Sequence, residues 1–179
     1  MRWLVKRFAP RRVVILMSLF VSSLAGAQTS VSDVKAQMID RFTQFIEWPS
    51  GAVPAKAPFV VCILGSGETA DQLARLAMAK RWKERACEVR HPTAATLGAC
   101  HVLYIAGGEA DRLGEILGTV SKSPVLTVGD RSGFAERGVL INLYQEGHYV
   151  RFEVNLGAVE STGLVFSSKL LRLARIVGR

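Results

Sequence analysis

The feature that most constrains the fold is a run of six apolar residues at 59–64, which no polar side chain interrupts. A strand with one solvated face alternates apolar and polar residues, whereas a strand buried on both faces is apolar throughout. Similar strand-like runs follow at 101–105 and 124–128. Glycine-containing turns and helix-like segments separate them, and strands that alternate with helices imply a mainly parallel sheet covered on both faces.

The rest of the chain supplies the covering helices and one hairpin. Residues 34–48 predict a helix with Asp33 as N-cap and Pro49 at its end. Further helices are expected at 68–79, 109–117, 155–162 and 167–177, and a short strand at 87–91. Two strand-like runs, 139–144 and 149–154, are joined by a turn containing Gly147 and predict an antiparallel hairpin.

These elements predict an α/β fold, a three-layer sandwich whose mainly parallel sheet is flanked by helices and ends in a C-terminal antiparallel hairpin. The closing helix at 167–177 would place its apolar side inward. That side consists of Leu170, Leu171, Leu173, Ala174 and Val177.

The N-terminus has the three parts of a secretory signal peptide. Five basic residues and no acid precede an apolar run at 13–21, and the segment ends in Ala25-Gly26-Ala27. The run is shorter than the roughly 20 residues that a membrane span needs. We therefore expect residues 1–27 to be removed on export to the periplasm and residues 28–179 to form one domain without direct membrane insertion.

Export changes how the net charge of +8 is interpreted. Without the five basic residues of 1–27, 18 basic and 15 acidic residues remain, a net charge of +3. Basic residues also form no stripe interleaved with aromatic side chains, the pattern that single-stranded nucleic acids require. Nucleic acid is therefore not an expected partner.

The three cysteines, Cys62, Cys87 and Cys100, are disulfide candidates in an oxidising compartment. Three cysteines allow one internal bond and leave one thiol, and the other interpretation is three small buried apolar residues. A metal site is disfavoured because Cys100 and the adjacent His101 point to opposite faces of a strand.

Two loops could bind a small ligand at the ends of the predicted strands. The turn at 65–69 places a Gly-x-Gly before a helix but has no third glycine, so it indicates a tight turn rather than a dinucleotide site. Asp130 and Arg131 follow the strand at 124–128, where open α/β sheets bind ligands. They could equally form a local ion pair or turn.

No motif for catalysis stands out. The chain has no Gly-x-Ser-x-Gly and no His-Glu-x-x-His. We therefore predict no catalytic residues, no metal and no cofactor, and a protein that is not an enzyme.

Two segments are candidates for partner binding. Trp48 ends an apolar cluster, which is core unless the tryptophan is exposed and anchors an interface. Residues 151–156 alternate strictly, so that Arg151, Glu153 and Asn155 share one face of a strand. That face is either an ordinary half-exposed strand or a charged recognition edge.

In order along the chain, the assembled segments resemble the YfiR family of small periplasmic proteins. The matching segments are 45–49, 61–65, 100–105, 124–130, 133–135, 141–142, 150–155 and 167–175. The resemblance implies an α/β sandwich, a homodimer and a role in cyclic-di-GMP signalling and biofilm regulation. It implies that the protein binds and represses the periplasmic sensor domain of an inner-membrane diguanylate cyclase. A periplasmic small-ligand-binding protein is the alternative.

The resemblance also implies that Cys62 and Cys100 form the disulfide and that Cys87 stays unpaired. The positions of these cysteines suggest that oxidation could tune repression. Apart from the resemblance, Glu153, Leu156, Val159 and Trp48 are the predicted partner-binding residues, and Asp130 and Arg131 are those of the alternative ligand site.

Overall fold

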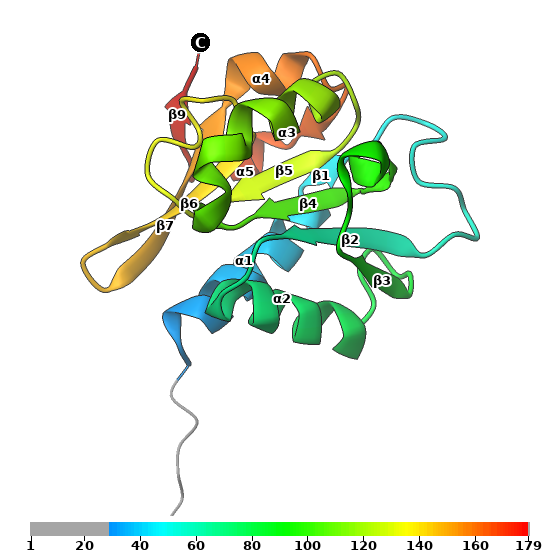
Figure 1. Cartoon of the computed structure of the whole chain (residues 1–179), viewed down its shortest axis with the longest axis horizontal. Helices are drawn as coiled ribbons and strands as arrows, with labels where there is room; N and C mark the ends of the chain where they lie inside the picture. Colours follow the sequence, from blue (N-terminus) through cyan, green and yellow to red (C-terminus); the bar gives the residue numbers. More distant parts are fainter. Residues whose placement is uncertain (1–28, 179) are drawn as a thin grey trace, which may run out of the picture.

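The computed structural model describes residues 29–178, in which helices cover both faces of a twisted sheet (Figure 1). The predicted signal peptide at 1–27 lies outside the described residues. In spatial order the strands are β3 (Cys87–Arg90), β2 (Phe59–Leu64), β4 (Val102–Ile105), β5 (Leu126–Gly129), β6 (Ile141–Glu146), β7 (Tyr149–Asn155) and β9 (Arg175–Val177). The first five are mutually parallel, β6 and β7 form the antiparallel hairpin, and β9 is parallel to β7. The predicted sandwich is confirmed.

The helices surround this sheet. They are α1 (Val31–Gln44), α2 (Glu68–Ala79), α3 (Leu113–Val120), α4 (Leu156–Glu160), α5 (Ser168–Leu171) and the short 3₁₀ helices η1 (Ala94–Ala99) and η2 (Gly107–Arg112). In Figure 1, α1 and α2 lie on one side of the sheet and α3 lies on the other. No helix within residues 29–178 has both the length and the apolar character to cross a membrane.

Successive side chains of each central strand enter two different apolar clusters. In β2, Val61 and Ile63 belong to the cluster under α1 and α2, while Val60 and Cys62 belong to the cluster under α3 and η1. All four are at most 5% exposed. The uninterrupted apolar run at 59–64 is therefore explained by burial on both faces.

Helix α1 begins earlier and ends earlier than the sequence predicts. Ser30, not Asp33, is the N-cap; the two form a capping box with N···O distances of 3.0 Å in each direction. At the other end the chain leaves the helix after Gln44 because β1 (Ile46–Glu47) pairs with β8 (Val165–Phe166) in a separate two-stranded sheet. We call this pair the mini-sheet.

The predicted closing helix at 167–177 is wrong over most of its length. Only α5 is helical, and Leu173, expected on the buried side, is 77% exposed. The chain then forms β9, with Ile176 opposite Val154 of β7. The β-branched Ile176 and Val177 favour a strand, and β7 offers an edge whose backbone groups need partners. The expected helix at 109–117 is likewise replaced by η2 followed by α3.

Candidate functional site

The carboxyl ends of β2, β4 and β5 meet beside α1, as the parallel topology requires. Asp130 follows β5, and its carboxylate pairs with the ammonium of Lys35 from α1 at 3.0 Å. Both side chains are about 15% exposed. Burial raises the pKa of Tyr104, and the nearby negative charge of Asp130 raises it further. These contacts hold α1 against the sheet.

Arg131 is exposed, and its guanidinium donates to the carbonyl of Gly107 at 2.8 Å. The two residues predicted for a ligand site are therefore both engaged within the chain, Asp130 by Lys35 and Arg131 by the loop after β4. The turn at Gly65 packs closely against the loop after β4, because a Cβ placed on Gly65 would lie 2.8 Å from the Cβ of Ala106. A ligand would therefore have little room at this edge of the sheet.

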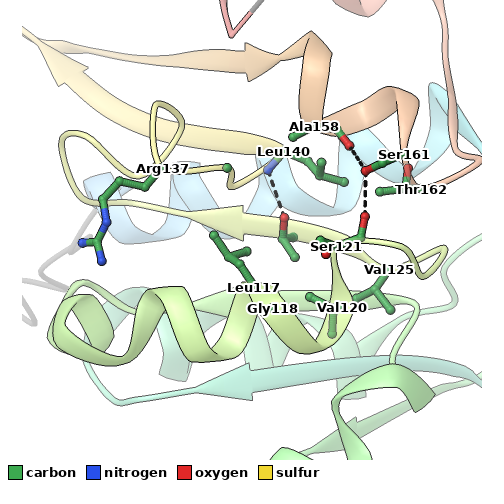
Figure 2. A pocket seen from close by; sticks show the side chains of 12 residues that line it. Leu117, Gly118, Val120, Ser121, Val125, Arg137, Leu140, Ala158, Ser161 and Thr162 are labelled. Carbon is green, nitrogen blue, oxygen red and sulfur yellow. Dashed lines mark hydrogen bonds between the residues drawn. The ribbon is translucent and has the colours of Figure 1, made fainter.

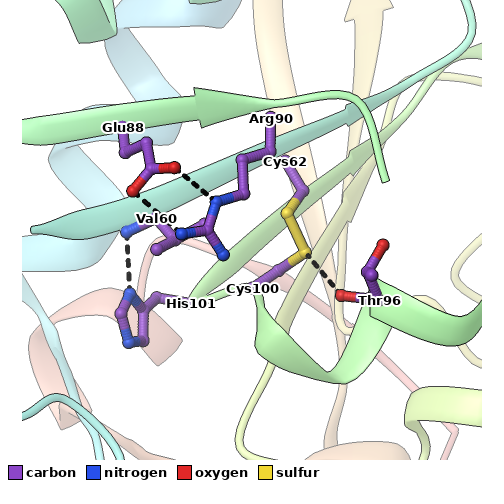
Figure 3. A network of polar contacts seen from close by, with 7 residues as sticks. All are labelled: Val60, Cys62, Glu88, Arg90, Thr96, Cys100 and His101. Carbon is purple, nitrogen blue, oxygen red and sulfur yellow. Dashed lines mark hydrogen bonds and ion pairs between the residues drawn. A yellow bond between two sulfur atoms is a disulfide. The ribbon is translucent and has the colours of Figure 1, made fainter. Parts of the chain in front are cut away.

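The disulfide joins Cys62 in β2 to Cys100, the residue that precedes His101 and β4 (Figure 3). The bond closes a sequence separation of 38 residues, and both cysteines are at most 3% exposed. The third cysteine, Cys87, lies half-buried on the edge strand β3 with no disulfide partner. Burial raises the pKa of its thiol to about 11, which keeps it protonated at neutral pH.

His101 fixes its own tautomer through two backbone contacts. Nδ1 accepts the N–H of Val60 at 2.8 Å (Figure 3), and Nε2 donates to the carbonyl of Ala52 at 3.1 Å. This arrangement requires a neutral ring with its proton on Nε2. Burial lowers the pKa of His101, and the charges of Arg85 and Arg90 lower it further against the opposing hydrogen bond to Ala52. His101 therefore ties the loop at Ala52 to the strand beside the disulfide.

The predicted partner-binding residues are mostly internal. Glu153 is 2% exposed, so the expectation of an exposed charged edge is wrong: β9 pairs with β7, and Arg175 covers the carboxylate and forms an ion pair with it. Val159 is 7% exposed and belongs to the apolar cluster under α1 and α2. Leu156 is half-buried and packs against that cluster.

Beneath Arg175 lies a buried polar row. The amide of Asn142 donates to Glu153 at 3.3 Å, and Asn155 donates to Ala135 at 2.7 Å while it caps α4. The guanidinium of Arg175 also stacks over the ring of Tyr144, 5.0 Å from its centroid. Glu153 thus anchors the C-terminal strand.

The mini-sheet has a solvated face that sequence reasoning missed. In its register Ile46 faces Phe166 on the buried side, while Phe45, Glu47, Val165 and Ser167 share the other side. Phe45 is 37% and Val165 is 60% exposed. With Lys169 they line a shallow hollow of about 320 Å³. We call these residues the mini-sheet face.

This face was missed because Phe45 lies within the helix predicted at 34–48, where an apolar residue is expected to face the core. The signal that could have found the face is the short apolar segment 164–166 between Gly163 and Ser167, which reads as a strand.

Trp48, at the end of β1, is half-buried; its ring meets Phe59 edge-on at 5.4 Å, and the ammonium of Lys83 lies 5.4 Å from its centroid. Lys83 also donates to the carbonyls of Thr43 and Ile46, at 3.0 and 3.1 Å. Lys83 therefore links the ring of Trp48 to the carbonyl of Ile46 in β1. Within residues 29–178 no three His, Cys, Asp or Glu side chains are grouped so that they could hold a metal ion.

Comparison with known proteins identifies the family of the chain and relatives of its fold. Residues 32–175 match the sequence model of the family described as YfiR/HmsC-like. The fold is similar to the crystal structure of a conserved domain protein from Vibrio cholerae, with a TM-score of 0.58 and 13% sequence identity. The similarity covers 82% of this chain but 60% of the Vibrio protein, so it shows the fold alone.

The disulfide should dominate stability. Replacing both Cys62 and Cys100 with Ser removes a cross-link whose loop-closure entropy is worth about 4 kcal/mol in the chain-entropy model. We expect the urea unfolding free energy to fall by that order, and Cys87→Ser, the matched control, to change it by less than about 1 kcal/mol. A double variant as stable as the wild type would contradict this role.

His101 should make stability pH-dependent. Its pKa in the folded protein lies below the unfolded value of about 6.5, so its contribution is present above that pH and is lost as the pH falls. Between pH 7 and 5.5 we expect a loss of roughly 1 kcal/mol that His101→Gln removes and the exposed His148→Gln leaves in place. Parallel pH curves for wild type and His101→Gln would refute the assignment.

The ion pair of Glu153 should hold β9 in place. Arg175→Met leaves the buried carboxylate uncompensated, and because the Arg175 side chain is itself 57% exposed we expect a loss of about 1–3 kcal/mol rather than the full value for a buried pair. The control is Arg151→Met, whose ion pair with Glu146 is exposed on both sides and should be worth less than about 1 kcal/mol. Equal unfolding free energies for the two variants would count against the anchoring role.

Proposed function

The chain belongs to the YfiR/HmsC-like family, whose members are periplasmic regulatory proteins rather than enzymes, and on that premise we propose that it represses an inner-membrane diguanylate cyclase. It does so by binding the periplasmic sensor domain of the cyclase, which lowers the cyclic-di-GMP made in the cytoplasm. Export of residues 28–179 after removal of the signal peptide is part of this proposal, as is a homodimer.

The observation that carries the proposal is the mini-sheet face. Phe45 and Val165 are diagonal neighbours on one solvated surface, and two exposed apolar side chains on a regular scaffold offer a partner a preformed contact. Glu47 and Lys169 flank them and supply charges of both signs at the rim. Apolar anchors surrounded by polar groups are typical of protein interfaces.

This surface replaces most of the predicted partner-binding residues. Glu153 and Val159 act from inside, because they fix β9 and α4, and along the chain α4 precedes β8 while β9 follows it. Trp48 directly follows Glu47, and it acts by holding β1 in place. Their substitution would weaken binding by disturbing the surface rather than by removing a direct contact.

Repression of this kind needs no chemistry from the repressor. If the sensor domain exchanges between an active and an inactive conformation, a protein that binds the inactive one more tightly shifts the equilibrium toward it. A hundredfold preference corresponds to about 2.7 kcal/mol, a difference that one or two buried anchors can supply.

The disulfide can connect repression to the redox state of the compartment. A dithiol reductant that supplies two electrons and two protons would convert the bond between Cys62 and Cys100 into two thiols and would itself become a disulfide. The repressor would lose the stabilisation of the closed loop and would release the cyclase.

The alternative function, small-ligand binding at Asp130 and Arg131, is less well supported. A ligand would have to displace Lys35 from Asp130 or the Gly107 carbonyl from Arg131. Both exchanges cost existing charge-assisted contacts.

The mini-sheet face is tested by a matched pair of variants. Val165→Asp places a charge within the face, and we expect it to weaken binding to the purified sensor domain by at least about tenfold. Met78→Asp introduces the same charge on α2, where Met78 is 69% exposed outside the face, and should leave binding within about twofold. Calorimetric titration gives both values, and unchanged binding of Val165→Asp would refute the contact.

A further inference from the structure

The seven-stranded sheet has an open edge at β3. This strand is outermost in the strand order and pairs with β2 alone (Figure 1). The N–H of Phe59 donates to the carbonyl of Ala86, and in a parallel ladder only alternate residues bond to the neighbouring strand. The even-numbered residues of β3 therefore direct their backbone groups toward β2. Cys87 and Val89 direct theirs outward, where no backbone group of residues 29–178 pairs with them.

The surface around α3 and α4 differs from this edge, because polar groups there have partners inside the chain. At the pocket between these helices, the hydroxyl of Ser161 donates to the carbonyls of Ser121 and Ala158, at 2.7 and 2.9 Å (Figure 2). An unpaired strand edge pairs readily with another chain unless Pro, a bulge or repelling charges prevent it. Residues 87–90 contain no Pro and carry one charge of each sign.

The charges on β3 fit a second copy of the chain. Glu88 and Arg90 share one face of the strand and form an exposed ion pair, with N···O distances of 2.7 and 2.9 Å (Figure 3). If two β3 strands pair antiparallel about a two-fold axis at Val89, Glu88 of each copy lies opposite Arg90 of the other. Each charge then has two neighbours of opposite sign. A neighbouring register would instead place Glu88 opposite Glu88, or Arg90 opposite Arg90, and like charges in that position repel.

The backbone and the other face of β3 favour the same register. The N–H and the carbonyl of Val89 point outward, so two copies exchange both hydrogen bonds at the axis, as opposed residues of an antiparallel pair do. The side chain of Val89 is half-buried against the cluster under α1 and α2, and pairing brings the two Val89 side chains together. Pro92, which lacks an N–H, follows the even-numbered alternation and leaves the outer row of donors complete.

We propose that two copies of the chain pair antiparallel through β3, with Val89 on the two-fold axis, and so join their sheets into one continuous sheet. The inference rests on the homodimer that is part of the proposed function, and it names the interface of that dimer. Because the same strand serves both copies, the contact is self-complementary and closes at two chains.

This register also assigns a state to Cys87. Cys87 of each copy lies opposite His91 of the other, so the two Cys87 residues are four positions apart along the paired strands. That separation is roughly 13 Å, whereas a disulfide requires Cα atoms within about 7 Å. Cys87 therefore does not cross-link the dimer.

The interface is tested by sedimentation equilibrium of the exported chain at about 1–200 µM. Val89→Pro removes the N–H at the axis but no hydrogen bond to β2, and we expect it to weaken dimerisation at least about tenfold. Cys87→Ser should dimerise within about twofold of wild type. Thermal unfolding at the lowest concentration checks that Val89→Pro remains folded.

A charge swap tests the register. Glu88→Arg and Arg90→Glu each place like charges opposite one another, and each should weaken dimerisation at least about fivefold. The variant with both substitutions restores opposite charges and should return to within about twofold of wild type. Glu146→Arg is the matched control, because it reverses one charge of the exposed ion pair with Arg151 on the hairpin, and it should change dimerisation by less than about twofold.

The outcomes separate this interface from the proposed function. A folded Val89→Pro variant that dimerises like wild type would overturn the interface but not the homodimer, and so would a double swap no tighter than the single variants. A wild-type chain that stays monomeric at about 200 µM would overturn both. These measurements contain no cyclase, so repression can fail while the dimer stands.

Discussion

Burial of β2, β4 and β5 on both faces is the constraint on which the rest of the structure depends. Their side chains alternate between two apolar clusters, so helices must cover both sides of the sheet. At roughly 25 cal/mol per Å² of buried apolar surface, this burial is the main favourable contribution to folding. It also explains the position of the disulfide, because Cys62 and Cys100 lie inside the cluster under α3 and η1, where the bond links β2 to the start of β4. At the end of β5, Asp130 holds α1 through its ion pair with Lys35.

The second half of the sheet follows a different rule. The hairpin of β6 and β7 carries Asn142, Glu153 and Asn155 into the interior, and buried polar groups are stable only when they are paired. Arg175 on β9 supplies the charge that Glu153 requires, so the C-terminal strand completes the sheet. With that edge covered, Phe45 and Val165 are two exposed apolar residues that share one surface, the mini-sheet, which the chain forms from two segments more than 100 residues apart.

How well the sequence predicted this structure depended on how local each signal was. The central strands, α2 and the hairpin follow from periodicity and turn residues close together in the chain, and these predictions are confirmed. The disulfide was predicted through family resemblance, since the spacing of three cysteines left the pairing open. The failures involve distant partners. The end of the predicted first helix forms β1 because Ile46 pairs with Phe166. The end of the predicted last helix forms β9 because Arg175 pairs with Glu153, and this pairing buries Glu153.

The most direct test of the central claim is the intracellular cyclic-di-GMP concentration in a strain that lacks this protein. The strain is complemented either with the full chain or with a version that lacks residues 1–27 and stays in the cytoplasm. The account predicts that deletion raises cyclic-di-GMP and that only the exported form restores the original level. An unchanged level across oxidising and reducing growth conditions, or full restoration by the form that lacks residues 1–27, would contradict repression from the periplasm.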